Sequence, residues 1–268
     1  MLKSRICAVI PICTVVTVLG ESICGTTSPI PSLEWISSQQ NPSGLLSSYY
    51  PKGEIADRTY DQAIGAIAYL LNVDSPNSPY LTAAETILNA MLNHVTPTGV
   101  TFNVNVLTGA GSGSVYDGPT SRLITAFALH WLITGQSTYS APVITLCNWL
   151  KQLQKSSGCL QGNLGVSWCK TEYNIDSYFA LKLAAYLSGD ATYETTAETM
   201  KGAISSTAMF ETTTNYKRFK NGYNDIYKDL LAQAYGAIMI AEKMGLSPTL
   251  ASVLQYAHNY FYTTQVPL

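Results

Sequence analysis

The stretch Thr59-Tyr-Asp-Gln-Ala-Ile-Gly-Ala-Ile-Ala-Tyr-Leu-Leu71 has the pattern of a helix that is apolar on almost every face. Four of its apolar residues, beginning at Ile64, follow the i, i+3, i+4, i+7 spacing of a helical core stripe. The remaining positions carry mostly small or apolar side chains, which is typical of a helix that is buried on all sides. Thr59 and Gln62 have the spacing of a capping box, which predicts that the helix begins at Thr59.

The same arrangement recurs along the chain, with an apolar first helix followed by a short turn and an amphipathic second helix. First helices are expected to begin near Thr59, Pro119, Asn174 and Ile226, and second helices near Pro79, Tyr139, Thr192 and Pro248. Aligned on Asp61, Arg122, Asp176 and Asp229, the four pairs repeat about every 50–60 residues, as in all-helical repeat architectures.

The lengths of the connections predict how these hairpins are arranged. Connections within pairs are short, whereas those between pairs are long, at about residues 95–118, 155–172 and 207–225. In antiparallel hairpins this alternation places the long loops at one end, above the N-termini of the first helices, where loops commonly carry function. Residues 100–106 alternate like a strand and precede a Gly-rich turn, so we expect a small β-hairpin in the first of these loops.

Composition excludes several classes of function. Charged residues make up 12% of the chain, with 15 Lys and Arg against 17 Asp and Glu. This balance leaves no basic surface for nucleic acid. No apolar run after the N-terminal segment predicts a membrane span. The Cys and His residues lack the spacing of metal ligands, and no nucleotide fingerprint is present, so we expect neither metal nor cofactor.

The N-terminus has the pattern of a secretory signal. Lys3 and Arg5 precede an apolar run from Ile6 to Leu19, and small residues follow as far as Gly25. We expect residues 1–25 to be a signal peptide and residues 26–268 to form one domain that is secreted, periplasmic or on the cell surface; an uncleaved anchor is the alternative. In an exported protein, Cys159 and Cys169 are expected to form a disulfide across a Gly-containing loop.

Acidic residues gather at the long-loop end of the predicted helices: Glu54, Asp57, Asp61, Asp117, Glu172, Asp176, Asp225 and Asp229. For each one alone, capping a helix N-terminus is the competing interpretation. Aromatic residues accompany them: Tyr60, Tyr116, Trp168, Tyr173 and Tyr223. Aromatic rings can cover the apolar face of a sugar, and two carboxylates can share the cleavage of a glycosidic bond.

Three motifs resemble the six-hairpin (α/α-toroid) glycosidase-like superfamily, in particular its exported bacterial members. They are Gln39-Gln-Asn-Pro-Ser-Gly-Leu45, Thr59-Tyr-Asp-Gln-Ala63 and Thr171-Glu-Tyr-Asn-Ile-Asp176, and the likeness covers about residues 31–262. The resemblance implies an (α/α) toroid with inner and outer helix rings. It places Asp61, Glu172 and Asp176 at the mouth, with Asn224-Asp225 as a further matching pair. With four hairpins and one lone helix at 32–40, the ring is expected to be open, smaller, or truncated after Leu268.

Together these observations predict a secreted, monomeric carbohydrate-active protein that is a glycoside hydrolase acting on a poly- or oligosaccharide. Glu172 is the expected general acid and Asp61 the base or nucleophile, with Asp225 as a rival base. Tyr60, Arg122, Trp168, Tyr173 and Asp176 are expected to hold substrate. Two alternatives stay open: a non-catalytic glycan-binding or cell-surface scaffold protein, and a polysaccharide lyase that would use Tyr173.

Overall fold

The structure, a computed structural model, describes residues 31–48, 57–239 and 247–262. The predicted signal peptide and Glu54 lie outside the described residues. The described chain folds into four helical hairpins: α4 (Thr59–Leu70) with α5 (Pro79–Leu92), α6 (Asp117–Thr134) with α7 (Ser140–Gln152), α8 (Thr171–Ser188) with α9 (Ala191–Ile204), and α10 (Leu230–Met239) with α11 (Ser247–Ala257). The lone helix α3 (Pro31–Ser38) precedes them, and a π-helical segment, His258–Tyr262, follows α11.

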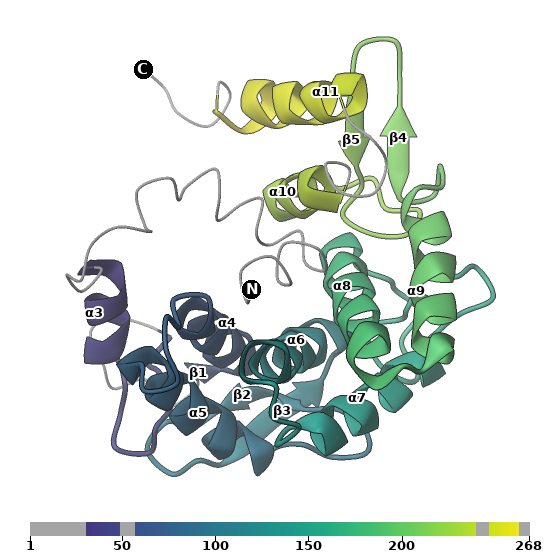
Figure 1. The fold of residues 1–268 in the computed structure, drawn as a ribbon. Helices are drawn as coiled ribbons and strands as arrows, with labels where there is room; N and C mark the ends of the chain where they lie inside the picture. The colour runs from purple at the N-terminus through teal and green to yellow at the C-terminus, as the bar shows by residue number, and fades with distance from the viewer. Residues whose placement is uncertain (1–30, 49–56, 240–246, 263–268) are drawn as a thin grey trace.

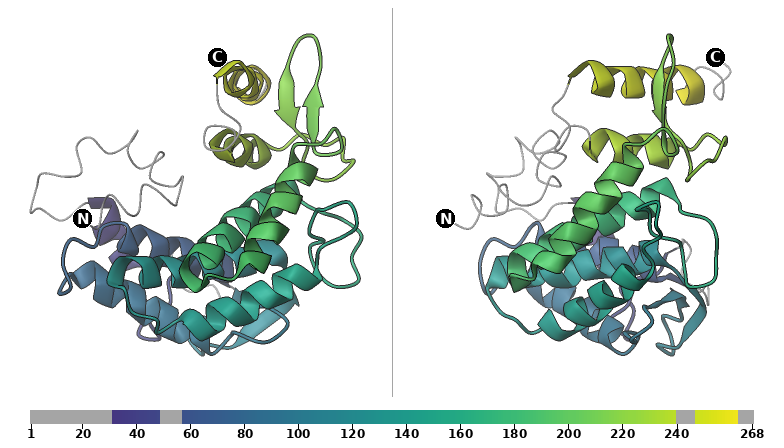
Figure 2. Two further views of the ribbon diagram at one scale, coloured as in Figure 1. Left: turned by 45° about the vertical axis from the view of Figure 1, so that its right-hand side comes forward. Right: turned by 90° about the vertical axis from the view of Figure 1, so that its right-hand side faces the viewer.

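The hairpins form two rows of helices along an arc (Figure 1). In the inner row α4 packs on α6, α6 on α8, and α8 on α10, while α5, α7 and α9 lie on the outside of the arc. The other views show the hairpin of α10 and α11 standing above one end of the arc (Figure 2). The predicted all-α class, with an inner and an outer row of hairpin helices, is therefore confirmed.

Two small sheets lie in the long loops. Strands β1 (Asp57–Arg58), β2 (Thr101–Val104) and β3 (Gly111–Val115) form an antiparallel sheet in that order. The predicted hairpin in this loop is thus present, extended by β1. Strands β4 (Phe210–Thr212) and β5 (Lys217–Phe219) form a second hairpin that the sequence pattern did not predict.

The fourth residue of each inner helix fastens that helix to the loop before it. Three of these residues are amides that both donate to and accept from one backbone residue: Gln62 to Leu46, Asn174 to Leu160, and Gln233 to Phe219, at 2.6–2.9 Å. In α6 the equivalent residue is Thr120, whose hydroxyl accepts from the Val100 amide at 3.3 Å. These four contacts define the structural repeat.

The predicted alignment on four charged residues is therefore wrong. Asp61 is the third residue of α4, Arg122 and Asp176 are the sixth residues of α6 and α8, and Asp229 precedes α10. The repeat follows the side chains that bond to loop backbone, and these are uncharged. The predicted capping box is also wrong, because neither of its side chains caps the helix. The Thr59 hydroxyl donates to the Thr101 carbonyl at 2.6 Å, and the Gln62 amide bonds to the backbone of Leu46.

The ends of the hairpin helices follow the sequence signals closely. Gly135 and Gly189 end α6 and α8 in the left-handed conformation, with φ of 73° and 74°, which glycine adopts without steric cost. The first helix of the fourth hairpin was expected near Ile226 but begins at Leu230. The carboxylate of Asp229 accepts a hydrogen bond from the Leu231 amide at 2.9 Å, so Asp229 caps this helix.

The lone helix α3 has the position of an outer helix. It runs into a turn in which the Gln40 amide donates to the Gly44 carbonyl at 2.9 Å. After the outer helix α7, Gln154 makes the same bond to Gly158 at 3.3 Å, and the two glycines have φ of 87° and 89°. The turn gives α3 the same relation to α4 that α7 has to α8.

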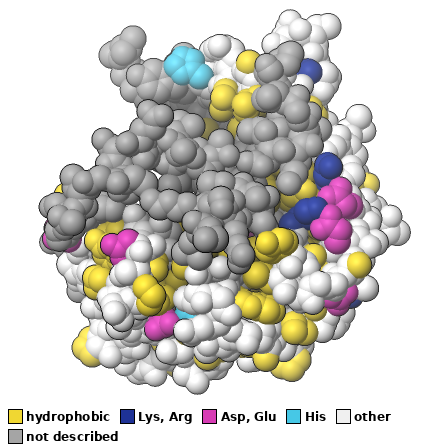
Figure 3. Space-filling view, viewed as in Figure 1, with side chains coloured by type: hydrophobic (Ala, Val, Ile, Leu, Met, Phe, Trp, Pro, Cys, Tyr) yellow, Lys and Arg dark blue, Asp and Glu magenta, His cyan; other side chains and the backbone are white. Residues whose placement is uncertain are grey.

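Charged side chains are sparse on the surface, as the composition predicts. Figure 3 shows acidic and basic side chains lying together over α8 and α9, while most of the described surface on this face is neutral or apolar. Lys182 on α8 bonds to Glu194 and Glu198 on α9, and Lys201 lies 3.3 Å from Glu198. Opposite charges are thus paired across two neighbouring helices.

We expect Asn174→Ala to lower the free energy of unfolding by about 2–4 kcal/mol, because it leaves the buried N–H and C=O of Leu160 without partners. The exposed Gln136→Ala in the α6–α7 turn is the matched control and should change little. Urea denaturation measures both variants. Equal stability of the two would contradict the role given to this amide.

Candidate functional site

The long loops meet above the N-termini of the inner helices, as the loop lengths predict. The first residue of an inner helix bonds to the loop of the next hairpin: the Asp117 amide donates to Gly162 at 3.0 Å and the Thr171 amide to Asn221 at 2.8 Å. Cys159 and Cys169 form a disulfide within the middle loop, with their Cα atoms 6.2 Å apart. Each loop is therefore held by its own hairpin and by a neighbouring one.

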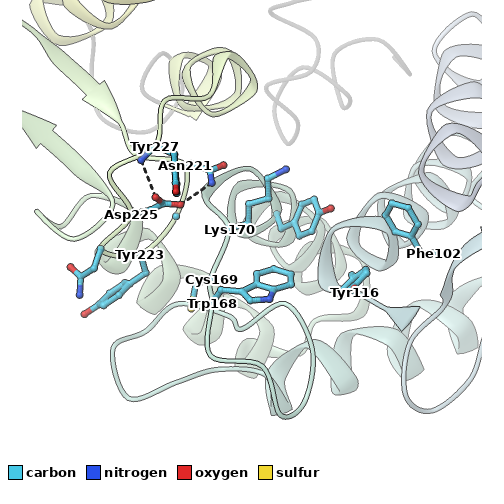
Figure 4. A pocket seen from close by; sticks show the side chains of 12 residues that line it. Phe102, Tyr116, Trp168, Cys169, Lys170, Asn221, Tyr223, Asp225 and Tyr227 are labelled. Atoms are coloured by element: carbon cyan, nitrogen blue, oxygen red, sulfur yellow. Dashed lines mark hydrogen bonds between the residues drawn. The ribbon is translucent and has the colours of Figure 1, made fainter. Parts of the chain in front are cut away.

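A cleft of about 700 Å³ opens between these loops (Figure 4). Its walls come from three loops and the first turn of α8: Phe102 and Tyr116 from the first loop, Trp168, Cys169 and Lys170 from the second, Tyr173 from α8, and Asn221, Gly222, Tyr223, Asn224, Asp225 and Tyr227 from the third loop. Its volume is in the usual range for a small-molecule site.

Four aromatic rings form a continuous row along the cleft. Phe102 lies 5.7 Å from Tyr116, Tyr116 lies 5.7 Å from Trp168, and Trp168 lies 6.2 Å from Tyr173, measured between ring centroids. Trp168 is 42% exposed, so part of its indole faces solvent. The row offers a ligand several flat apolar surfaces in succession.

Polar groups, together with Tyr223 and Tyr227, form the opposite wall. Asp225 accepts hydrogen bonds from the Asn221 amide at 2.8 Å and from the Tyr227 backbone N–H at 2.9 Å (Figure 4). A carboxylate has about four acceptor positions, so these two bonds leave capacity for a ligand. At Gly222 a Cβ atom would lie 2.6 Å from the Cys169 carbonyl oxygen, so only glycine allows the two loops to approach this closely.

The second loop connects the cleft with buried acids. Lys170 lies on the cleft wall, and its ammonium is 2.7 Å from Glu172, which is only 5% exposed. The same ammonium lies 4.8 Å from the centre of the Tyr173 ring. Tyr173 packs directly on the N-terminus of α6, where a Cβ at Gly118 would meet its ring at 2.3 Å.

A buried cluster below the cleft joins all four inner helices. Arg122 of α6 lies 2.6 Å from the carboxylate of Asp176 on α8, and its Nε donates to the Tyr60 hydroxyl on α4 at 3.2 Å. The guanidinium also lies over the rings of Tyr60 and Tyr235, at 5.4 and 4.8 Å. The Tyr60 and Tyr235 hydroxyls bond to each other at 2.6 Å, which links α4 to α10.

Burial dominates the electrostatics of these acids. It raises the pKa of Asp176 to about 7; Arg122 opposes the shift and Glu172 adds to it. Asp117, at the start of α6, is completely buried, and burial raises its pKa well above the usual value although the backbone N–H groups of Gly118 and Asp117 oppose this. Burial also raises the pKa of the Tyr60 and Tyr235 hydroxyls, so both act as neutral hydrogen-bonding groups.

The structure separates the residues proposed from the sequence into three groups. Trp168, Tyr173 and Asp225 line the cleft, and Glu172 touches the cleft-lining Lys170. Tyr60, Arg122 and Asp176 bond to one another in the buried cluster. Asp61 is half-buried on α4 and belongs to neither the cleft lining nor this cluster.

Sequence reasoning missed Phe102, Lys170 and Tyr235. The first two carry no signal that distinguishes them from other loop residues. Tyr235 is the sixth residue of α10, as Arg122 and Asp176 are the sixth residues of their helices. An alignment of the repeats on the amides of Gln62, Asn174 and Gln233 would therefore have identified Tyr235 as a candidate. Within the described residues, no cluster of three His, Cys, Asp or Glu is placed to hold a metal ion.

Paired inner and outer helices, with the connecting loops gathered above the inner row, give the described residues the fold of an (α/α) toroid, of which they form an arc. No protein-family model and no curated protein matches the sequence. Solved structures with a similar fold include an α-amylase from Clostridium perfringens, at 14% identity and TM-score 0.63, covering 88% of this chain and 71% of that one. A D-mannose isomerase is similar at 11% identity and TM-score 0.63, covering 85% and 68%.

A third similar structure is the glycoside hydrolase family 76 mannosidase Bt3792 from Bacteroides thetaiotaomicron VPI-5482. It has 13% identity and TM-score 0.56, and the alignment covers 81% of this chain and 58% of that one. At these identities the likeness establishes the fold alone. In the part of the chain that the structure describes, no helix is long and apolar enough to cross a membrane.

We expect Asp176→Leu to lower the free energy of unfolding by about 3–5 kcal/mol, because it leaves the buried Arg122 guanidinium without the carboxyl group that bonds to it. The double variant Arg122→Met, Asp176→Leu should lose much less, since no buried charge then lacks a partner. Denaturation of Asp176→Leu, Arg122→Met and the double variant gives the coupling. Strictly additive losses would show that the two side chains do not stabilise each other.

The contribution of Asp117 to the free energy of unfolding should fall as the pH rises above about 4. The native carboxyl of Asp117 keeps its proton at a higher pH than it does in the unfolded chain, so deprotonation favours the unfolded state. In Asp117→Asn this group no longer titrates. Its stability relative to the native sequence should therefore rise with pH, by at most about 1.4 kcal/mol per pH unit.

Denaturant titrations at several pH values measure this difference. Gln136→Ala, at an exposed position without a titrating group, is the control and should give a difference that does not depend on pH. A flat difference for Asp117→Asn as well would contradict the pKa shift assigned to this buried carboxyl.

Proposed function

We propose that this protein is a carbohydrate-active protein that binds a glycan along the aromatic row of the cleft and hydrolyses a glycosidic bond there. The observation that carries the proposal is the row of Phe102, Tyr116, Trp168 and Tyr173 facing a polar wall in one cleft. Rings of this kind stack on the apolar faces of sugars, while amide and carboxylate groups bond to the hydroxyls. The three similar structures are named as an amylase, a mannose isomerase and a mannosidase, which supports a sugar as ligand.

Glu172 and Asp225 are the carboxylates best placed for the reaction. Asp225 lines the cleft and keeps acceptor capacity, and Glu172 meets the cleft through Lys170. In this proposal a substrate hydroxyl displaces the Lys170 ammonium, and Glu172 then takes up a proton from solvent and gives it to the leaving oxygen. Asp225 accepts a proton from the water that attacks the anomeric carbon. Asp61 is the weaker candidate for the base because it does not line the cleft.

Two ion pairs favour a second candidate function, the binding of a glycan without catalysis. The ammonium of Lys170 engages Glu172 at 2.7 Å, and the guanidinium of Arg122 engages Asp176 at 2.6 Å. A carboxylate that stays bonded to a cation is not free to protonate a leaving group. Tyr173 gives little support to the lyase alternative. Burial raises the pKa of its hydroxyl to about 12, so the hydroxyl keeps its proton near neutral pH and is poorly suited to act as a base.

Export is part of the proposal. Residues 1–25 have the order of charge and apolar residues that marks a signal peptide, so the glycan would be met outside the cytoplasm. We expect residues 1–25 to be removed during export, and mass spectrometry of protein recovered outside the cytoplasm gives its N-terminus. Finding residues 1–25 intact on that protein would contradict the cleavage.

The proposed function is tested by incubating the protein with a panel of polysaccharides while recording both released reducing ends and retention on the glycan. On a substrate that the protein cleaves, Glu172→Gln should lower turnover by about 10²–10⁴-fold and leave retention nearly unchanged. A lower melting temperature is expected as well, because Lys170 loses its counter-charge. Trp168→Ala should lower retention, and Glu34→Gln on the exposed side of α3 is the matched control.

The outcomes separate the candidates. Full turnover by Glu172→Gln would overturn the catalytic assignment, and comparison of Asp225→Asn with Asp61→Asn identifies the second carboxylate. Retention without any reducing ends, lost in Trp168→Ala, would establish the binding protein instead. Neither retention nor cleavage on any glycan of the panel would overturn the proposal as a whole.

A further inference from the structure

A second cavity, of about 380 Å³, lies between the β4–β5 hairpin and the C-terminal helices. It is lined by Asn215, Tyr216, Ser252, Gln255, Tyr256, Asn259 and Tyr260. None of these residues lines the cleft described above. The hairpin and α11 stand at the end of the arc, and α11 lies across β5 (Figures 1 and 2).

Three tyrosine rings form a row in this cavity. Tyr216 of the hairpin lies 5.0 Å from Tyr256 of α11, and Tyr256 lies 5.8 Å from Tyr260, with the last two rings only 7° from parallel. The row resembles the aromatic row of the cleft in its spacing, although its residues come from a different part of the fold. It gives this cavity a flat apolar surface as well.

The row is fixed by contacts behind it. Tyr256 is buried, and Arg218 lies over its ring at 5.8 Å. The Lys217 backbone N–H donates to the Ser252 hydroxyl, and the Lys217 ammonium donates to the Thr249 hydroxyl, both at 3.0 Å. These bonds hold the hairpin against α11, so the cavity is largely formed before any ligand enters.

The polar groups of the lining are all uncharged. They are three amides, a serine hydroxyl and the tyrosine hydroxyls, and the Gln255 amide donates to the Asn259 side-chain oxygen at 2.7 Å, which orients both amides at the rim. An amide both donates and accepts, as a sugar hydroxyl does. An anionic ligand would instead require cations in the lining, and the lining contains none. Lys228 lies near the cavity, but its ammonium already contacts the Tyr260 ring, 3.8 Å from the ring centre.

We propose that this cavity is a second carbohydrate-binding site, specific for an uncharged sugar and separate from the cleft. The half-buried rings of Tyr216 and Tyr260 would take the apolar face of one or two sugar rings, with the buried Tyr256 packed behind them. Asn215, Gln255 and Asn259 would bond to the sugar hydroxyls. The inference goes beyond the proposed function and does not require the cleft to be catalytic. On a polysaccharide, the two sites would engage different parts of one chain and strengthen its retention.

Affinity electrophoresis of the whole protein tests the second site, in gels that contain mannan, amylopectin, xylan or the anionic polygalacturonate. Tyr216→Ala and, separately, Asn259→Ala should weaken retention by about three- to tenfold in at least one of the three uncharged gels. Asn259 is exposed, so its variant tests the site even if loss of the Tyr216 ring loosens the hairpin. Gln136→Ala, an exposed amide on the α6–α7 turn, is the matched control.

A cleft variant distinguishes this inference from the proposed function. If Trp168→Ala lowers retention while Tyr216→Ala and Asn259→Ala behave like the native protein, the second site is overturned and the cleft stands. If Tyr216→Ala and Asn259→Ala lower retention while Trp168→Ala changes neither retention nor cleavage, the cleft is overturned and the second site stands. Retention in polygalacturonate that these two variants abolish would overturn the choice of an uncharged sugar, and absence of retention in every gel would overturn the site itself.

Discussion

Arg122 is a buried cation around which the inner row of helices is organised. A charge in the protein interior must be paired and hydrogen-bonded, or it destabilises the fold strongly. Asp176 supplies the counter-charge from α8, Tyr60 accepts a hydrogen bond from α4, and the Tyr60 and Tyr235 rings lie over the guanidinium. Because these partners come from three other helices, satisfying one side chain fixes the positions of all four inner helices.

The cleft depends on that fixed inner row. Its three loops each begin where an outer helix ends. The first is tied to α4 by the Thr59 hydroxyl, and the other two are tied to the starts of α6 and α8 by the backbone N–H groups of Asp117 and Thr171.

Thr120, Asn174 and Gln233 add a second tie between each loop and the inner helix that follows it. A ligand in the cleft would therefore meet walls that belong to different hairpins but are fastened to the same inner helices.

Neutral polar groups and tyrosines give the molecule its chemical character. Ion pairs occupy the outer surface of α8 and α9, and the carboxylates of Glu172 and Asp176 are held by Lys170 and Arg122. Both cavities combine rows of aromatic rings with amides, and the second contains no charged residue in its lining. This chemistry suits uncharged ligands rich in hydroxyls, which is why the two proposals concern the same class of ligand.

Sequence alone determined the helices and their order, because the signals for a helix are local. Apolar periodicity marks the helix itself, Pro79 marks the start of α5, and Gly135 and Gly189 mark the ends of α6 and α8. It also identified most of the aromatic cleft, since the long loops had to lie at one end. Only the tertiary structure decided which acids are buried and paired. Asp176 contacts Arg122, which lies 54 residues away in the sequence, whereas Asp61 contacts neither of them. Burial and pairing depend on neighbours distant in sequence, and no local pattern records them.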